Sequence, residues 1–190
     1  MLDSTRLAYL KQRPLWDFAL GFYASPGVET ACLRLQEEQE VDVCELLFHC
    51  WLFGHGLAAR QEALSAIRES QNAWQRDVTQ MVRTLRRQLK ELAQRDADVG
   101  RLRSTLKDAE LQAERVTLQR WQAWVWESKE PASRLMDIAV TQQNASYWLQ
   151  NQLFSPQLPG SVGHQRTLDR TANSAWDALV RQLDPLKLPR

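Results

Sequence analysis

The chain has 190 residues, of which 44% are hydrophobic and 25% are charged, a composition normal for a globular protein of ordinary size. Its net charge of +1 argues against a dedicated nucleic-acid-binding protein, because such proteins usually carry a basic excess. The charge is uneven, however, with 6 basic and 10 acidic side chains in residues 1–70 and 11 basic and 7 acidic ones in residues 71–125. Nucleic acid therefore stays a possible partner of the middle segment, although it is not favoured.

Three cysteines occur, at Cys32, Cys44 and Cys50, an odd number without a CxxC pair. All three lie in apolar helical patterns, where a free cysteine behaves as a small hydrophobic residue. Residues 1–6 contain no apolar run of the kind found in secretory signals. These features predict a cytoplasmic protein in a reducing compartment, with no membrane partner.

Only 7 Gly and 7 Pro are present, which leaves long uninterrupted segments and favours helices. The segment 15–23 that follows Pro14 is almost entirely apolar and predicts a short, largely buried helix. Val28, Ala31, Cys32 and Leu35 then recur at helical spacing, which predicts an amphipathic helix.

The stretch from Asp42 to Phe53 is apolar on nearly every side, so we expect it to form the central helix of a bundle. It is too short to span a bilayer. Asp42 is a good N-cap, and Glu45 three residues later resembles the second half of a capping box. Gly54 and Gly56 are expected to end the helix.

A helix is predicted over residues 58–69, followed by two long helices with apolar stripes. The first stripe consists of Trp74, Val78, Met81, Leu85, Leu89 and Leu92, and the second of Leu102, Leu106, Ala109, Ala113 and Val116. A short polar turn at 96–100 separates them, which indicates an antiparallel helical hairpin closed along the two stripes.

A charged break at 127–131 precedes two further expected helices. Their stripes are Leu135, Ile138, Gln142, Ala145 and Leu149, and then Leu168, Ala172, Ala175, Leu179 and Leu183. No segment alternates clearly enough to predict a strand. The fold class expected is therefore all-α: a helical bundle with a long antiparallel hairpin and a two-helix C-terminal extension, divided into a core domain over 14–126 and an extension over 132–184 that packs on the core.

Three motifs follow one another along the chain: Leu15-Trp16-x-Phe18-Ala19, Asp42-Val43 with Leu46-Leu47-Phe48, and Ala109-Glu110-Leu111-x-Ala113-Glu114. In this order they resemble a proteobacterial family of small proteins of unknown function. The resemblance covers roughly residues 15–118. It implies an all-helical cytoplasmic protein, and it brings no activity, cofactor or catalytic residue.

Trp121, Trp124 and Trp126 lie within six residues and point to more than one side of a helix. Tryptophan is enriched at binding hot spots, so the three are candidate partner-binding residues. The alternative is that Trp148 or Trp176, on the C-terminal helices, folds back and buries them.

Arg83, Arg86, Arg87 and Lys90 form a basic cluster on the first hairpin helix. The functional interpretation is contact with the phosphates of RNA or another polyanion. The favoured alternative is pairing across the hairpin, because an antiparallel turn near residue 98 brings Asp108, Glu110 and Glu114 opposite residues 82–90.

Glu45 and His49 lie four residues apart on one helix face and could form half of a metal site or an acid–base pair. Helix capping by Glu45 and a core role for His49 explain them more simply. We therefore predict no catalytic residue, no metal and no cofactor.

The leading hypothesis is a non-enzymatic interaction or adaptor protein that binds another protein or a second copy of itself. The second is an RNA- or ribosome-associated factor that uses the basic cluster. The third and weakest is a small-molecule or metal-dependent enzyme that uses Asp17, Glu45 and His49.

Overall fold

A computed structural model describes residues 2–138, 145–154 and 170–183, and the fold is all-α as expected. A single two-stranded sheet accompanies the helices of the described segments. In chain order the elements are α1 (Ser4–Gln12), α2 (Leu15–Tyr23), α3 (Val28–Gln39), α4 (Val43–Gly54), β1 (Leu57–Ala59), α5 (Ser65–Trp74), α6 (Gln80–Gln88), α7 (Ala97–Trp126), α8 (Pro131–Arg134), β2 (Leu135–Asp137), α9 (Ala145–Phe154) and α10 (Arg170–Gln182).

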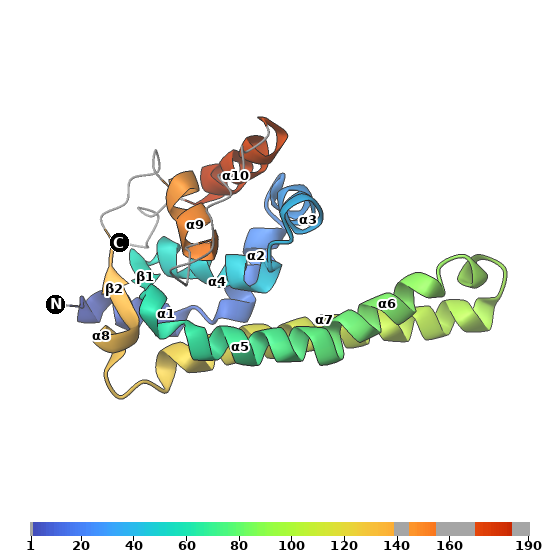
Figure 1. Cartoon of the computed structure of the whole chain (residues 1–190), viewed down its shortest axis with the longest axis horizontal. Coiled ribbons are helices and arrows are strands. Elements are labelled where there is room, and N and C mark those ends of the chain that lie inside the picture. The colour runs from blue at the N-terminus through green and yellow to red at the C-terminus, as the bar shows by residue number, and fades with distance from the viewer. Residues whose placement is uncertain (1, 139–144, 155–169, 184–190) are drawn as a thin grey trace, which may run out of the picture.

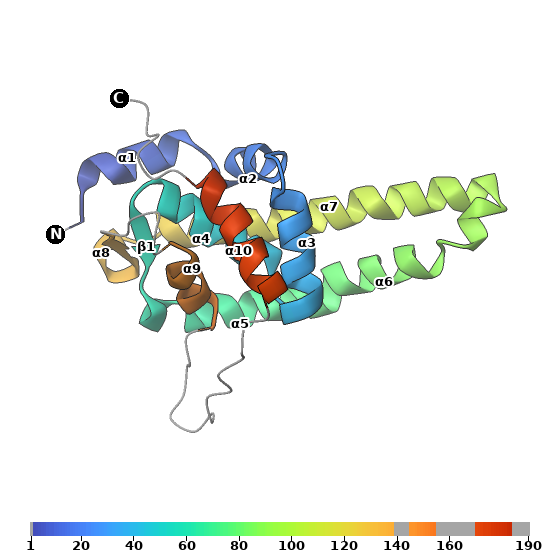
Figure 2. The same cartoon turned by 90° about the horizontal axis from the view of Figure 1, so that it is seen from above.

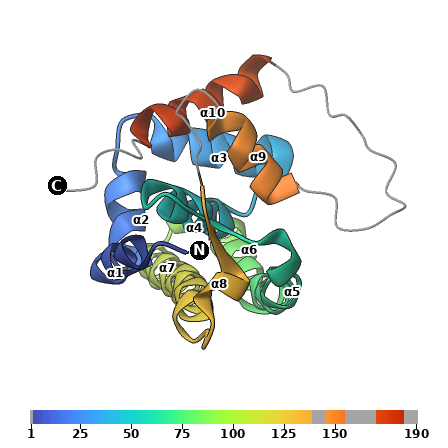
Figure 3. The same cartoon turned by 90° about the vertical axis from the view of Figure 1, so that its left-hand side faces the viewer.

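Helix α4 lies at the centre of the molecule, between the hairpin of α5, α6 and α7 on one side and α3, α9 and α10 on the other (Figures 1 and 3). Side chains on every side of this helix are buried, from Leu46 through Phe53 without interruption. A helix that is apolar all round needs cover all round, and the two layers provide it. The predicted central helix is thus confirmed.

Both ends of α4 are fixed by local chemistry. Asp42 is the N-cap, and its Oδ1 accepts hydrogen bonds from the backbone N–H groups of Cys44 (2.8 Å) and Glu45 (3.1 Å). The expected capping box is only half formed, because the Glu45 carboxylate pairs with Arg68. After the last turn the chain reverses at Gly56, which has a φ of +69°. The positive φ favours glycine, and a Cβ there would also force the end of the Arg6 side chain, 2.8 Å away at Nη1, to move.

Two short strands contradict the sequence prediction. Residues 57–59 and 135–137 pair antiparallel, with Ala58 opposite Met136. The helix expected over 58–69 therefore begins only at Ser65, and the helix expected to start at Leu135 is a strand at that point. Leu57, Ala58 and Ala59 are all buried, so β1 has no alternation that a period-two pattern could reveal.

The C-terminal helices complete the core. Helix α10 lies along α3 (Figure 2), and α9 lies against α4, where the Trp148 ring meets Phe53 at 5.2 Å between centroids. Leu149, Trp176 and Leu179 belong to the same hydrophobic cluster as the buried side chains of α4. The predicted core domain 14–126 and the predicted extension 132–184 thus share one core. Gln142 and Leu168 of the expected stripes lie outside the described residues.

The hairpin projects beyond the rest of the molecule (Figures 1 and 2). Its first limb runs through α5, a π-helical turn at Gln75–Thr79 and α6, and its second limb is the 30-residue helix α7. Asp96 caps α7 by accepting hydrogen bonds from the N–H groups of Asp98 and Val99. Among the described residues, no helix combines the length and apolar character needed to cross a membrane.

Candidate functional site

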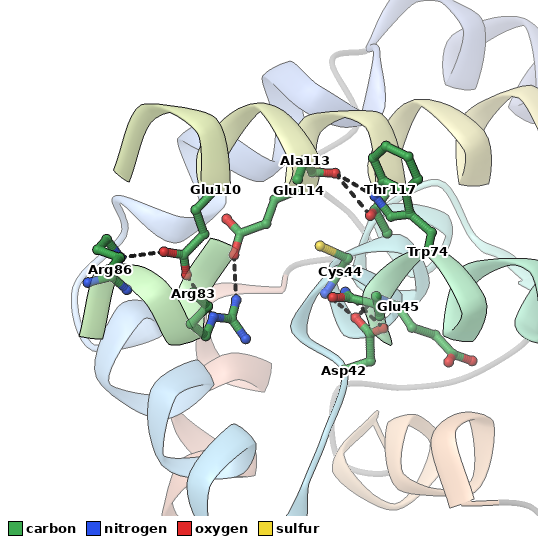
Figure 4. A network of polar contacts seen from close by, with 11 residues as sticks. Asp42, Cys44, Glu45, Trp74, Arg83, Arg86, Glu110, Ala113, Glu114 and Thr117 are labelled. Atoms are coloured by element: carbon green, nitrogen blue, oxygen red, sulfur yellow. Dashed lines mark hydrogen bonds and ion pairs between the residues drawn. The ribbon is translucent and has the colours of Figure 1, made fainter. Parts of the chain in front are cut away.

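Ion pairs hold α6 against α7 (Figure 4). Arg83 Nε donates to Glu110 Oε1 at 2.7 Å, and Arg83 Nη2 donates to Glu114 Oε1 at 2.8 Å. Arg86 donates to the second oxygen of Glu110. Both arginine side chains are largely buried, with 14% of Arg83 and 22% of Arg86 exposed. The expected pairing across the hairpin is therefore present for these two arginines, which share Glu110.

The π-helical turn decides which side of α6 faces α7. Upstream of it, Trp74 faces α7 and donates to the Ala113 carbonyl at 3.2 Å. A regular α-helix would place Val78, Met81 and Leu85 on that same side. A π turn accommodates one extra residue. The residues of α6 that face α7 are therefore shifted by one position along the sequence, a rotation of about 100°. Thr79, which is fully buried, and the two arginines accordingly occupy the contact instead.

The apolar stripe of the first limb consequently lies outside. Met81, Leu85 and Leu92 are between 45% and 66% exposed, and Leu102 at the start of α7 is 51% exposed. We call residues 75–112, the outer part of the hairpin, the arm. In the arm, ion pairs replace much of the expected apolar seam: Met81, Leu85, Leu92 and Leu102 face solvent, whereas Leu89 and Leu106 are partly buried.

Burial and pairing shift the pKa values of the two glutamates in opposite directions. Burial alone would raise the pKa of Glu110, but the hydrogen bonds from Arg86 and Arg83 outweigh it and lower that pKa. Burial raises the pKa of Glu114, because its single partner, Arg83, offsets only part of the cost. Glu110 is thus a firmly ionised anchor, whereas Glu114 is the carboxylate of the seam that protonates more readily.

The other two members of the basic cluster are placed differently. Arg87 and Lys90 are exposed, and neither forms an ion pair within the part of the chain that the structure describes. Asp108, which was expected to take part in pairing, is exposed as well. The polyanion-binding prediction for the cluster therefore depends on Arg87 and Lys90, since Arg83 and Arg86 are neutralised inside the hairpin.

The three members of the tryptophan cluster also differ in how deeply they are buried. Trp121 is buried and stacks on Phe48 of α4, with 4.6 Å between ring centroids. Trp124 is partly buried and lies edge-on to both rings. Among the described ring contacts, Trp148 meets His49 and Phe53 and Trp176 meets Phe154, so the ring that stacks on the cluster is Phe48 instead. Trp126 is 37% exposed and is the member of the cluster most open to a partner.

Glu45 and His49 meet as their spacing predicts, but in a closed environment. His49 Nε2 lies 3.5 Å from Glu45 Oε1, and Arg68 Nη2 lies 2.6 Å from the same oxygen. His49 is completely buried, and burial lowers its pKa. No group of three or more His, Cys, Asp or Glu side chains suited to a metal ion occurs within the described ranges. This pair therefore ties α4 to α5, through Arg68, and is shielded from solvent.

A cleft opens where the arm meets the helices α2 and α3. It has two adjoining compartments of about 400 and 420 Å³, which share Gln36, Cys44, Arg83, Arg87 and Glu114 in their walls. The inner compartment has mostly apolar walls, and the outer one is lined mainly by polar side chains of α3, α5 and α6. Volumes of this size are typical of small-molecule sites. Burial raises the pKa of the Cys44 thiol at the junction well above the usual value, which keeps the thiol protonated at neutral pH.

Comparison with protein-family models gives a match over residues 14–121, more than half of the chain, to a family described as "Protein of unknown function (DUF2390)". The chain belongs to the DUF2390 family. Comparison with curated proteins gave no match, and comparison with solved structures gave none either.

The DUF2390 match runs from Pro14 to Trp121 and so contains the whole arm and both compartments of the cleft. The resemblance noted in the sequence is confirmed as far as membership of a family of unknown function. Sequence reasoning missed the cleft because its walls come from six separate helices, α2 to α7. A sequence signal for the cleft does exist, because Leu20 and Leu33 lie away from the buried faces of α2 and α3.

Proposed function

We propose that this DUF2390 protein is a non-enzymatic adaptor in the cytoplasm, and that it binds a partner protein along the arm. The observation that carries the proposal is the rotation of α6 by the π-helical turn, which places Met81 and Leu85 outside the hairpin. Exposed apolar side chains in a contiguous segment commonly mark protein-interaction sites. π turns also occur often at functional positions in helices.

The non-enzymatic part of the proposal is supported by the state of the reactive groups. His49 is completely buried, and the thiols of Cys32, Cys44 and Cys50 are buried with raised pKa values. Thiols with raised pKa values stay protonated at neutral pH and are poor nucleophiles. Three reduced cysteines that serve as core residues also suit a cytoplasmic setting.

A protein is favoured over RNA as the partner because of how the charges of the arm are arranged. Arg83 and Arg86 already form ion pairs with Glu110 and Glu114, so these two arginines add little to the electrostatic attraction for phosphate. Arg101 is paired in turn with Asp98. The arm therefore offers apolar side chains with scattered charges around them, which is the usual composition of a protein interface.

Site-specific photo-crosslinking in cells tests the proposal. A photoreactive phenylalanine derivative is placed at Leu85 or Leu92, where large exposed side chains already occur. Matched controls carry it at Ser104, which lies on the far side of α7 from Leu102, and at the exposed Glu62 of the main body. We expect discrete protein adducts from the two arm positions and none from the controls. The mass of the adduct distinguishes another protein from a second copy of the chain.

A nuclease step separates the proposal from its alternative. Adducts that disappear on nuclease treatment, and that require Arg87 and Lys90, would favour the RNA-associated factor and contradict the adaptor. Equal adducts at Leu85 and Ser104 would mean that the apolar side of the arm has no special role. The double variant Met81→Gln/Leu85→Gln, with the crosslinker kept at Leu92, should lose the adduct if the exposed stripe is the binding surface.

A further inference from the structure

The inner compartment of the cleft gathers exposed leucines from three different helices. Leu20 of α2, Leu33 of α3 and Leu111 of α7 all line it, and each is between 44% and 51% exposed. Trp16, Leu47 and Leu118 complete the apolar part of the wall. Three half-exposed leucines that converge on one cavity offer an apolar ligand a place to bury surface, which the empty cleft leaves in contact with water.

The polar groups of this compartment include several hydrogen-bond donors. Arg87 is a guanidinium with no ion pair among the described residues, and Gln36 lies in the same part of the wall. Tyr23 also lines the compartment, and burial raises the pKa of its hydroxyl to about 12, so the hydroxyl keeps its proton at neutral pH. Donors of this kind match a ligand group that accepts hydrogen bonds, and a guanidinium favours one that is negatively charged.

Several carboxylates also line the cleft. Glu110 and Glu114 line the inner compartment, but Arg83 and Arg86 already engage them. Glu29 is exposed, and it lies on the first turn of α3 while Gln36 lies two turns further on. The outer compartment adds carboxylates that carry no ion pair to Arg87 within the described chain: Glu37, Glu40 and Asp42. Of the three arginines that line the inner compartment, Arg83 and Arg86 are paired with glutamates, and Arg87 remains available to a ligand.

We infer that the inner compartment binds a small amphipathic anion, with an alkyl or aromatic body against the leucines and Trp16 and an anionic head at Arg87. The site is separate from the partner-binding surface proposed for the arm, because Met81 and Leu85 line neither compartment. The ligand is a free molecule rather than a bilayer lipid. The cleft is walled by α2 and α3 on one side and by α6 and α7 on the other, which a planar membrane surface does not enter.

The probe for the test is anilinonaphthalene sulfonate, an aromatic body with one anionic group whose emission rises in apolar sites. Titration of the full chain should show one saturable site, with energy transfer from protein tryptophan because Trp16 lines the compartment. Monomeric decanoate should displace the probe, and decanol, which lacks the charge, should do so poorly. Arg87→Gln should weaken probe binding about five- to tenfold, the loss of one partly solvated charge-assisted hydrogen bond.

Three matched variants complete the test. Leu33→Gln should weaken the binding of both probe and decanoate, whereas Lys90→Gln, which removes an exposed cation outside the cleft, should not. Met81→Gln/Leu85→Gln controls for probe adsorbed on the arm and should keep the wild-type affinity. Because Arg87 and Leu33 are exposed, these variants should fold normally, as melting curves can check.

Two results would overturn the inference. One is unchanged probe affinity in both Arg87→Gln and Leu33→Gln, which would place the probe elsewhere. The other is co-sedimentation with phosphatidylglycerol vesicles without displacement of the probe by decanoate, which would assign the leucines to a membrane surface. Neither result depends on whether the arm binds a partner protein.

Discussion

The orientation of α6 predicts an unusual order of mutational costs in the hairpin. In an ordinary hairpin the apolar stripe forms the seam, so that replacing Met81 would be expensive and replacing a neighbouring arginine cheap. The structure predicts the reverse. The comparison uses Arg83→Gln and Met81→Gln, two substitutions on the same helix that introduce the same side chain.

The magnitudes follow from burial and pairing. Met81 is 66% exposed, so about a third of its side chain is buried, and the substitution should cost below about 1 kcal/mol. Arg83 is only 14% exposed and serves both Glu110 and Glu114. Breaking a buried ion pair costs about 3–5 kcal/mol, and the lower end, ~3 kcal/mol, applies here because Glu110 keeps Arg86.

Urea unfolding and amide hydrogen exchange together measure the difference. For a chain of this size the cost of Arg83→Gln corresponds to a melting temperature lower by about 6–12 °C. Because Arg83 joins α6 to α7, exchange at the amides of α6 should respond most strongly. Equal costs for the two variants, or a larger cost for Met81→Gln, would refute the rotated arrangement of α6. Arg87→Gln, which removes an unpaired exposed arginine, should change stability by less than about 0.5 kcal/mol and serves as the control.

Three further predictions test the core, the cap and the titration of the seam. Phe48→Ala should lower the free energy of unfolding by about 3–5 kcal/mol in urea titrations, because Phe48 is completely buried against Trp121; a loss below about 1 kcal/mol would contradict its place in the core. Asp42→Ala should cost about 1 kcal/mol through loss of the α4 N-cap, and Asp42→Asn should recover most of it, since Asn also caps. Glu114 has a raised pKa in the folded state, so its contribution to stability is full below the ordinary carboxyl pKa of 4.5 and is lost as the pH rises through the folded pKa. Glu114→Gln should therefore gain stability relative to wild type between pH 4.5 and neutral, and a constant difference across that range would argue against the shift.

Much of the fold could be predicted from local chemistry. The N-cap at Asp42 and the apolar run that follows it each act over a few residues, and both are found in the structure. The polar turn expected at 96–100 lies earlier in the chain, between Gln88 and Asp96, because Asp96 caps α7 and residues 97–100 form its first turn. The antiparallel register about that turn was also enough to pair Arg83 with Glu110 and Glu114. These features follow from the geometry of a helix and its ends, so residue spacing in the sequence is enough to predict them.

The failures arise from contacts between distant segments. Strand β1 is three residues long and fully buried, and its partner at Leu135 lies at the other end of the hairpin in sequence. Nothing local distinguishes such a segment from the start of a helix. The stacking of Trp121 on Phe48 likewise depends on how α7 crosses α4. Residue spacing alone gave no reason to prefer Phe48 over Trp148 or Trp176 as the ring that packs on Trp121.

The prediction of an apolar seam in the hairpin failed for a different reason. Trp74, Val78, Met81 and Leu85 keep strict helical spacing, so the sequence itself is suited to a regular helix with an apolar seam. The chain instead forms a π turn after Trp74, puts the fully buried Thr79 and two arginines into the contact, and leaves Met81 and Leu85 facing water. A local pattern and a tertiary structure that disagree in this way are most often found where function constrains the sequence. Met81 and Leu85 stabilise the free protein little at these exposures, so their apolar character supports the proposal that a partner covers them on the projecting arm.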